Sequence, residues 1–208
     1  ISKESYDYYT SLGYKVIQIP NAIDISSLSF NEDRKYEKQV IFAGRLSKEK
    51  GVKTLIEICK KLPHDIHLII IGDGPEVENI KKLESSQNNI HYLGSKNHQQ
   101  TISLIKGSDV LVQPSFSEGI STTILESMAC KTVIVASNVG GNLELIQDQE
   151  SGILVEPTNP EIFCEKIIEL ISDKLLRNKL STLSYENVKK YDWNIIGKQY
   201  LELYNSLL

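Results

Sequence analysis

The sequence predicts an α/β protein built on a doubly wound, Rossmann-like parallel sheet of about six strands, with helices at its C-terminal end. From residue 38 onward, short and mostly apolar runs alternate with amphipathic segments, which is typical of βαβ units whose sheet is covered on both faces. The runs are four to six residues long and rich in Val and Ile, as expected for central parallel strands. Two further amphipathic segments follow the last run, so the fold should end in helices.

The predicted elements follow one another regularly. Strands are expected at 40–43, 66–71, 90–93, 110–113, 132–136 and 152–155. Helices are expected at 51–61, 75–85, 97–106, 121–129, 142–146, 160–172, 174–189 and 192–207, opened or closed by Gly, Pro, Ser or Asn. Residues 1–14 are interpreted as the end of a helix, 15–20 as a short strand and 26–37 as a polar linker. The last helix carries apolar side chains that we expect to pack on a second domain outside this chain: Trp193, Ile196, Tyr200, Leu203 and Leu207.

Composition places the chain among ordinary globular proteins. Its 208 residues include 23 basic and 27 acidic side chains, a net charge of −4, with 40% hydrophobic and 24% charged residues. This is enough chain for a domain with its own core, and it excludes disordered, collagen-like and coiled-coil proteins. Because there is no basic field for a phosphate backbone, we expect no nucleic acid partner.

Cysteine and histidine placement gives no indication of a metal centre. The cysteines are odd in number and have no C-x-x-C spacing, so they are interpreted as reduced core residues of a cytosolic protein: Cys59, Cys130 and Cys164. The histidines stand at no metal-ligand spacing and are interpreted as surface or loop residues: His64, His67, His91 and His98. We therefore expect no metal and a cytoplasmic location.

The start of the chain suggests a piece of a longer protein. Residue 1 is Ile, within a helix-like pattern and without the charged leader and apolar stretch of a signal peptide. No apolar run approaches the roughly 20 residues that a membrane-spanning helix needs. We expect a fragment that does not cross a membrane.

The loop after the first strand is the first candidate for chemistry, because ligands of open parallel sheets bind beyond the carboxyl ends of the strands. This loop, Gly44–Gly51, places Arg45 and Lys50 near the start of a helix. Helix-start N–H groups and neighbouring cations bind phosphate oxygens. The alternative is a solvated charge run, since the loop lacks the spacing G-x-x-x-x-G-K-[ST] of a phosphate loop. The turn at 72–74 likewise lacks the third glycine of a dinucleotide fingerprint.

The segment after the fourth strand is the most informative. Glu118 precedes a helix that should begin near Ser121, and Glu126 lies about one turn inside that helix. The N–H groups of Thr122 and Thr123 then point out of the positive end of the helix dipole. Two carboxylates flanking an anion site match a nucleotide-sugar, with its ribose diol, diphosphate and sugar hydroxyls. The alternative is a capping arrangement with Ser121 as N-cap and a Thr123-x-x-Glu126 capping box.

A pair of glycines follows the fifth strand. Gly140 and Gly141 stand directly before a predicted helix. They indicate either a close approach of two backbone segments or a simple tight turn.

Taken in order, five motifs resemble one family. They are Ile19–Asp24, Gly44-Arg45-Leu46 with Lys50-Gly51, Gly72–Pro75, Tyr92-Leu93-Gly94 and Glu118–Cys130. Together they are similar to the C-terminal, donor-binding half of a retaining glycosyltransferase of the GT-B fold, in family 4 of glycosyl transferases group 1. The resemblance covers the chain from about residue 17 to residue 207.

The resemblance implies roles for the phosphate and sugar contacts. Arg45 and Lys50 match the basic pair that neutralises the donor diphosphate, the leaving group, in place of a metal ion. Glu118 matches the first glutamate of the family's paired motif, near the transferred sugar, and with the two cations it is the expected catalytic set. The N–H groups of Thr122 and Thr123 would contact phosphate.

The resemblance also implies a nucleoside site. Glu126 matches the second glutamate of the motif, which accepts hydrogen bonds from the ribose. The loop of Gly94, Ser95 and Lys96 would lie beside the base. A UDP-linked sugar is the expected donor. Because Ile120 and Ser121 replace a common Phe-Gly pair beside the sugar, the sugar itself is not indicated.

For the whole protein, the resemblance implies a donor half that works with a second domain. Residues 1–25 would be a linker from a missing N-terminal domain, 26–190 the nucleotide-sugar-binding domain and 191–208 a crossover helix. The missing half would hold a glycan or lipid-linked acceptor, as part of O-antigen or other bacterial surface polysaccharide synthesis at the inner face of the membrane. The alternatives are a GT-B nucleotide-sugar epimerase and a non-catalytic nucleotide-binding module.

Overall fold

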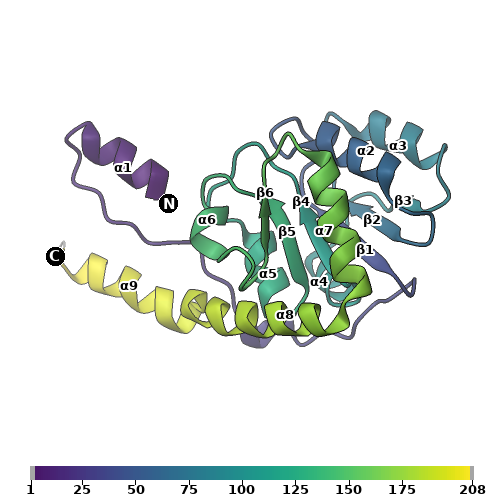
Figure 1. Ribbon diagram of the computed structural model, residues 1–208. Helices are drawn as coiled ribbons and strands as arrows, with labels where there is room; N and C mark the ends of the chain where they lie inside the picture. Colours follow the sequence, from purple (N-terminus) through teal and green to yellow (C-terminus); the bar gives the residue numbers. More distant parts are fainter. Residues whose placement is uncertain (1–2, 207–208) are drawn as a thin grey trace.

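The computed structural model describes residues 3–206, apart from the side chain of residue 4, and confirms the six-stranded parallel sheet (Figure 1). The strands are β1 (Gln39–Ala43), β2 (His67–Ile71), β3 (Ile90–Tyr92), β4 (Val110–Gln113), β5 (Val133–Ser137) and β6 (Ile153–Val155). Their order is β3-β2-β1-β4-β5-β6, and every neighbouring pair is parallel. The chain reverses its direction of winding between β1 and β4, where such sheets form a crevice at their carboxyl edge.

Helices cover both faces of this sheet (Figure 1). One core joins alternate strand residues to α2 (Val52–Lys61), α3 (Val77–Glu84) and α7 (Pro160–Ser172). The other joins the intervening strand residues to α4 (His98–Lys106) and α5 (Thr122–Ala129). Burial on both faces explains why the strands read as continuous apolar runs instead of alternating ones.

The remaining helices lie around this body. They are α1 (Lys3–Ser11), the short 3-10 helix η1 (Ile25–Leu28), α6 (Asn142–Leu145), α8 (Lys174–Val188), η2 (Lys189–Tyr191) and α9 (Trp193–Asn205). Figure 1 shows α1 and α9 projecting from the same side of the sheet body. Within residues 3–206, no helix is long and apolar enough to cross a membrane.

Several sequence predictions need correction. Residues 15–20 form no strand, and η1 interrupts the start of the region expected to be a linker. His67 and His91 are not loop residues but stand on β2 and β3, half-buried, with both rings stacked on Tyr36. The three cysteines are free thiols, and Cys130 is only partly buried.

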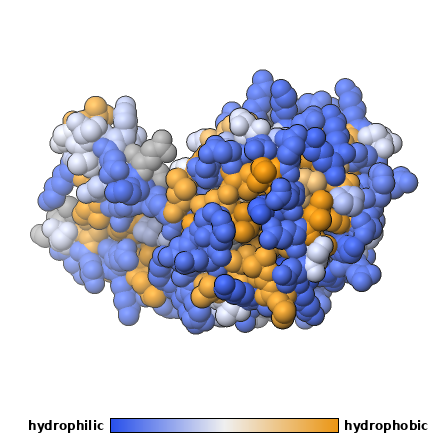
Figure 2. Space-filling view, in the orientation of Figure 1, coloured by the Kyte–Doolittle hydropathy of each residue, from blue (hydrophilic) through white to orange (hydrophobic). Residues whose placement is uncertain are grey.

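The apolar stripe of the last helix is divided. Ile196 is buried, whereas the Trp193 side chain is 51% exposed, and Leu207 lies outside the described residues. Figure 2 shows further apolar side chains at the surface of the face that carries α7 and α8, among a mostly hydrophilic periphery. The packing of this stripe on a second domain stays a prediction.

Candidate functional site

A small pocket lies at the carboxyl edge of the sheet, beside the point where the winding reverses. Its volume is about 200 Å³, and its walls come from the ends of β1 and β2, the loop after β3, and the first turns of α4 and α5. The lining residues are Ala43, Gly44, Ile71, Gly72, Ser95, Lys96, Thr101 and Thr123. The structure therefore brings together Ser95, Lys96 and Thr123, three of the predicted nucleotide contacts.

An ion pair joins two of the predicted catalytic residues. The Lys50 Nζ atom donates to both carboxylate oxygens of Glu118, at 2.8 Å to Oε1 and 2.7 Å to Oε2. Only 4% of the Glu118 side chain is exposed, against 32% for Lys50. The cation thus faces solvent while the carboxylate behind it is buried. Since an ammonium carries three N–H donors, one of them remains available to a ligand.

Two neutral side chains fix the buried Glu118 carboxylate. The Ser115 hydroxyl donates to Oε1 at 2.6 Å, and the Gln113 amide donates to the same oxygen. The Gln113 amide also donates to the Ser121 hydroxyl at 3.1 Å. A buried carboxylate is costly unless hydrogen bonds replace its lost water. The end of β4 supplies that replacement, so the position of Glu118 is set before any ligand arrives.

Close backbone contacts hold the loops around Glu118 in place. Gly51 has a φ of +70°, and a Cβ atom there would lie 1.8 Å from the Pro114 carbonyl oxygen. Gly140 has a φ of +45°, and its Cβ would lie 2.1 Å from the Glu118 carbonyl oxygen. Only glycine fits both conditions. Of the two interpretations of Gly140-Gly141, the structure shows the close approach, and the backbone it approaches is that of Glu118.

The start of α5 is capped as expected in one respect and not in the other. Ser121 is the N-cap, and its side chain accepts from the Ile124 N–H. Thr122 and Thr123 occupy the first two helical positions, where N–H groups have no acceptor within the helix. The capping box between Thr123 and Glu126 is wrong, because the N-cap is two residues earlier and Glu126 has another partner.

That partner is His98, at the start of α4. Its Nε2 atom lies 2.9 Å from Glu126 Oε1. Burial raises the pKa of the Glu126 carboxyl, and the hydrogen bond from His98 opposes this shift. Glu126 is therefore a carboxylate that is only partly solvated, and its Oε2 atom accepts no hydrogen bond from the protein within residues 3–206.

The other predicted site residues lie around this arrangement. Arg45 directly follows the pocket residue Gly44, is exposed and makes no ion pair within residues 3–206. Gly94 has a φ of +67°, and its carbonyl accepts from the Gly72 N–H at 3.1 Å, which ties the loop after β3 to the end of β2. Lys50 and Glu118 do not line the small pocket, so the predicted set divides into a nucleoside-side pocket and an adjacent ion pair.

Sequence reasoning missed four residues that the structure adds to the site. Gln113 and Ser115 hold Glu118, His98 holds Glu126, and Thr101 lines the pocket. A signal existed for Gln113, which is a polar side chain at the end of an apolar strand, buried to 4% exposure. Asn21, part of the Ile19–Asp24 motif, also reaches the site: its amide donates to the Ile120 carbonyl at 2.6 Å and fastens the segment before η1 to the site loop.

This arrangement suits a ligand with a negative charge next to hydroxyl groups. The Lys50 ammonium and the first-turn N–H groups of α5 are donors suited to an anion, and the exposed Arg45 adds a positive charge to the loop that carries Lys50. The Glu126 oxygen that His98 does not contact can accept from a hydroxyl, whereas the Glu118 oxygens already accept from Lys50, Gln113 and Ser115. The pocket at the strand ends has room for a planar ring.

Comparisons with known proteins identify the family. A family model described as glycosyl transferases group 1 matches residues 25–187. A curated Campylobacter jejuni relative, N,N'-diacetylbacillosaminyl-diphospho-undecaprenol alpha-1,3-N-acetylgalactosaminyltransferase, is 31% identical over 172 residues, which cover 81% of this chain and 45% of that protein. The chain spans about half the length of the curated relatives it matches.

Solved structures agree on the fold. The C-terminal domain of a glycosyl transferase group 1 family protein, LpcC, from Francisella tularensis has a TM-score of 0.71 and 30% identity, covering 82% of this chain and 98% of that one. Anabaena HepE, solved in complex with UDP, has a TM-score of 0.84 and 22% identity, covering 99% of this chain and 62% of that one.

Proposed function

This chain belongs to the glycosyl transferases group 1 family, and from that premise we propose that it is the donor-binding half of a retaining glycosyltransferase that takes a UDP-linked sugar. The observation that carries the proposal is the Lys50–Glu118 ion pair at the start of α5, beside the pocket at the strand ends. A relative of the same fold, HepE, has been solved with UDP. That supports the choice of base.

The proposed binding mode follows the charges of the site. Ser95, Lys96 and Thr101 line the space for the base, and Glu126 accepts from the ribose hydroxyls. The diphosphate lies over the start of α5, where the Thr122 and Thr123 N–H groups and the Arg45 and Lys50 cations meet its oxygens. Glu118 then faces the sugar hydroxyls.

The proposed mechanism needs the protein to stabilise a leaving diphosphate. As the glycosidic bond of the donor breaks, negative charge grows on the diphosphate oxygen. Arg45, Lys50 and the helix-start N–H groups are already in place to receive that charge, which lowers the barrier because little reorganisation is required. Glu118, fixed by Gln113 and Ser115, orients the sugar. In this proposal no metal ion takes part.

The proposed domain organisation places this chain after an N-terminal half. Residues 26–190 would be the donor domain, with 1–25 and 191–208 as connections to that half. The match to a domain named as C-terminal in its own protein, over 98% of its length, supports this order. The missing half would bind a glycan or lipid-linked acceptor; the name of the Campylobacter relative contains such a lipid diphosphate. Surface polysaccharide synthesis on the cytoplasmic side of the membrane is the role we propose for the whole enzyme.

Calorimetric titration with UDP in the presence of EDTA tests the binding mode. The wild-type chain should bind, and Arg45→Met should weaken binding by about 1.5–3 kcal/mol, the size of hydrogen bonds to charged groups. Lys60→Met is the matched control, because Lys60 is exposed on α2 and lies outside the pocket. Equal affinities of the Arg45 variant and the wild type would overturn the phosphate assignment. Binding that requires added Mg²⁺ would overturn the metal-free mechanism.

A further inference from the structure

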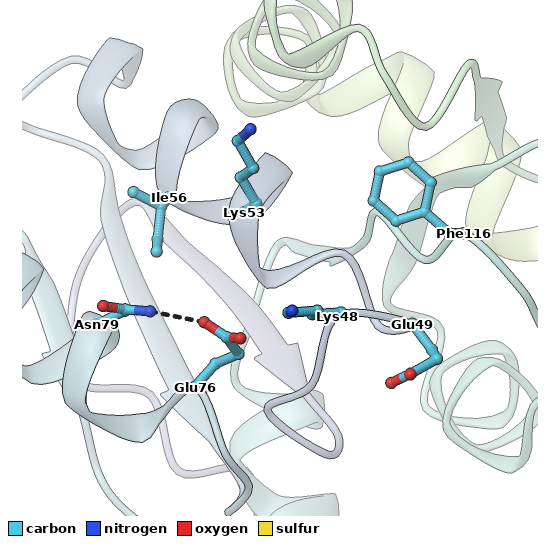
Figure 3. Close-up of a pocket in the computed structure, with 7 residues that line it drawn as sticks. All are labelled: Lys48, Glu49, Lys53, Ile56, Glu76, Asn79 and Phe116. Carbon is cyan, nitrogen blue, oxygen red and sulfur yellow. Dashed lines mark hydrogen bonds between the residues drawn. The ribbon is translucent and has the colours of Figure 1, made fainter.

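A second and larger cavity lies next to the site, between α2, α3 and the loop after β4 (Figure 3). Its volume is about 560 Å³, within the range of small-molecule binding sites. Figure 3 shows Ile56 and the Glu76–Asn79 pair on one side, Phe116 and Glu49 on the other, and Lys48 and Lys53 between them. None of these seven residues has a role in the proposed donor site.

Ile56 and Phe116 give this cavity two apolar walls among charged and polar side chains. Ile56 packs partly against the core, while the Phe116 ring is 45% exposed although it stands in a loop held by buried neighbours. A separate, smaller hollow of about 220 Å³ also has Lys53 and Phe116 in its wall, together with Thr158 and Pro160. Lys53 and Phe116 therefore border both spaces.

Some charged groups at the cavity have hydrogen-bond partners, and others have none within residues 3–206. The Glu76 carboxylate accepts from the Asn79 amide at 2.6 Å (Figure 3), and the Ser47 hydroxyl donates to the Glu49 carboxylate and lowers its pKa. Lys48 and Lys53, by contrast, make no ion pair or hydrogen bond through their ammonium groups within residues 3–206, although the charge of Lys48 helps to lower the pKa of Glu49. The cavity thus offers two cations without a hydrogen-bond partner in the described part of the chain, next to an apolar surface and the Glu49 and Glu76 carboxylates.

From this combination we infer that the cavity binds an amphiphilic anion, a single phosphate group carried on an alkyl chain. The chain would lie against Ile56 and Phe116, and the phosphate would meet Lys53 and Lys48. An uncharged amphiphile would leave both cations without a partner, and a bare phosphate would leave the apolar walls exposed to water.

The cavity is connected to the donor site through two loops. The Phe116 N–H donates to the Glu49 carbonyl at 2.8 Å; Lys50 is the residue after Glu49, and Glu118, its ion-pair partner, is two residues after Phe116. A ligand that moves Glu49 or Phe116 therefore also acts on Lys50 and Glu118. Binding of the amphiphile and of UDP should each change the affinity for the other by the same factor. This coupling rests on the proposed function, whereas the cavity site itself does not.

The test compares three probes that separate the two parts of the ligand. Dodecyl phosphate, below its micelle-forming concentration, should bind one per chain and at least about tenfold more tightly than dodecyl maltoside or inorganic phosphate, a difference of about 1.4 kcal/mol. Equal binding of dodecyl maltoside would show an unspecific apolar surface and would overturn the inference. No saturable binding of dodecyl phosphate would overturn it as well.

Two variants locate the binding. Lys53→Gln should weaken dodecyl phosphate binding about tenfold while leaving UDP affinity unchanged in the absence of the amphiphile. Lys82→Gln, at an exposed position on α3 outside the cavity, should change neither. If the two variants behave alike, the phosphate is not held at Lys53 and the inference fails. UDP binding measured in the same samples reports on the proposed function separately, because its loss leaves the dodecyl phosphate result standing.

A further arm distinguishes the sources of the phosphate. Vesicles of phosphatidylcholine containing phosphatidic acid should retain the wild-type chain, and Lys53→Gln should lose retention, if the ligand is a membrane lipid. Binding of soluble dodecyl phosphate without vesicle retention assigns the site to a free alkyl phosphate. Either result supports the site, and retention that Lys53→Gln does not reduce counts against it.

Discussion

Glu118 and Glu126 lie eight residues apart on one loop and helix, yet the structure holds their carboxylates in opposite ways. Glu118 is buried, shares one oxygen with Gln113 and Ser115, and faces the Lys50 ammonium. Within residues 3–206 the Glu126 carboxylate has one hydrogen-bond partner, His98, and burial raises the pKa of Glu126. Glu118 is an internal anchor. Glu126 is incompletely solvated and can accept a hydrogen bond from a ligand.

Because Glu118 and Glu126 have such different surroundings, one short segment can serve two parts of a ligand. The anchor must not move when charge develops beside it, so its hydrogen bonds come from buried groups of its own strand and loop. The second carboxylate must accept from ribose hydroxyls when the ligand arrives, so a single protein hydrogen bond, from the exposed His98 side chain, suits it. Changes to the anchor should therefore affect both stability and binding, and changes at Glu126 should affect them in opposite directions.

The largest effect is expected for Glu118→Ala. The Gln113, Ser115 and Lys50 donors would lose their shared acceptor, and leaving buried donors unpaired should lower the free energy of unfolding by about 1–3 kcal/mol. Affinity for UDP-glucose should fall far more than affinity for UDP. Glu118→Gln, which keeps one acceptor oxygen, separates the two effects by retaining more stability. Urea unfolding and calorimetry measure both, and equal losses for UDP and UDP-glucose would contradict the sugar role.

A second comparison separates the two cations. Lys50→Met and Arg45→Met should each reduce UDP affinity by about 1.5–3 kcal/mol. Only Lys50→Met should also lower the melting temperature, because it removes the charge partner of a buried carboxylate, whereas Arg45 has no ion pair within residues 3–206. Thermal unfolding of the two variants side by side checks this. A stability loss in Arg45→Met as large as that in Lys50→Met would show that the Lys50–Glu118 ion pair has no particular role in stability.

Glu126→Gln should produce a smaller loss of binding and a gain of stability. A neutral amide avoids the burial cost of the carboxylate, and it accepts ribose hydroxyls less strongly. We expect UDP affinity to fall about tenfold and the melting temperature at pH 7 to rise. A melting temperature lower than that of the wild type would mean that the contact with His98 outweighs burial.

The smallest effect is the pH dependence of that gain. The pKa of Glu126 in the folded protein lies above its usual value of 4.5. Protonated Glu126 therefore adds to the free energy of unfolding below pH 4.5, and this contribution is lost as pH rises through the folded pKa. The advantage of Glu126→Gln should therefore be absent at pH 4 and appear as pH rises to 7. Unfolding curves across this range decide the matter, and an advantage independent of pH would contradict the raised pKa.

The sequence predicts the sheet well because its information is local. Most strands are short apolar runs rich in Val and Ile between turn residues, and the six predicted runs match β1 to β6 within two residues at each end. The false strand at 15–20 has a similar pattern, but a strand needs a neighbour to pair with, which local sequence does not show. His67 and His91 were misplaced for a related reason, because stacking on Tyr36 accounts for their half-burial on strands.

The site was predicted only in part. The resemblance to known motifs identifies Lys50 and Glu118, and the structure then pairs them across 68 positions of the chain. The roles of Gln113 and Ser115 depend on how β4 and its loop turn back on Glu118, which no spacing rule reveals. The same holds for His98, whose contact with Glu126 requires α4 and α5 to lie side by side.

The most direct test of the donor-site proposal is to follow backbone amide resonances of the ¹⁵N-labelled chain during titration with UDP in EDTA. The proposal predicts the largest shifts at Ser95, Lys96, Thr122 and Thr123, around the pocket at the strand ends and the start of α5. Ile56 and Asn79, in the larger cavity, should move little. Shifts confined to that larger cavity, or no shifts at saturating UDP, would contradict the placement of the nucleotide at the carboxyl edge of the sheet.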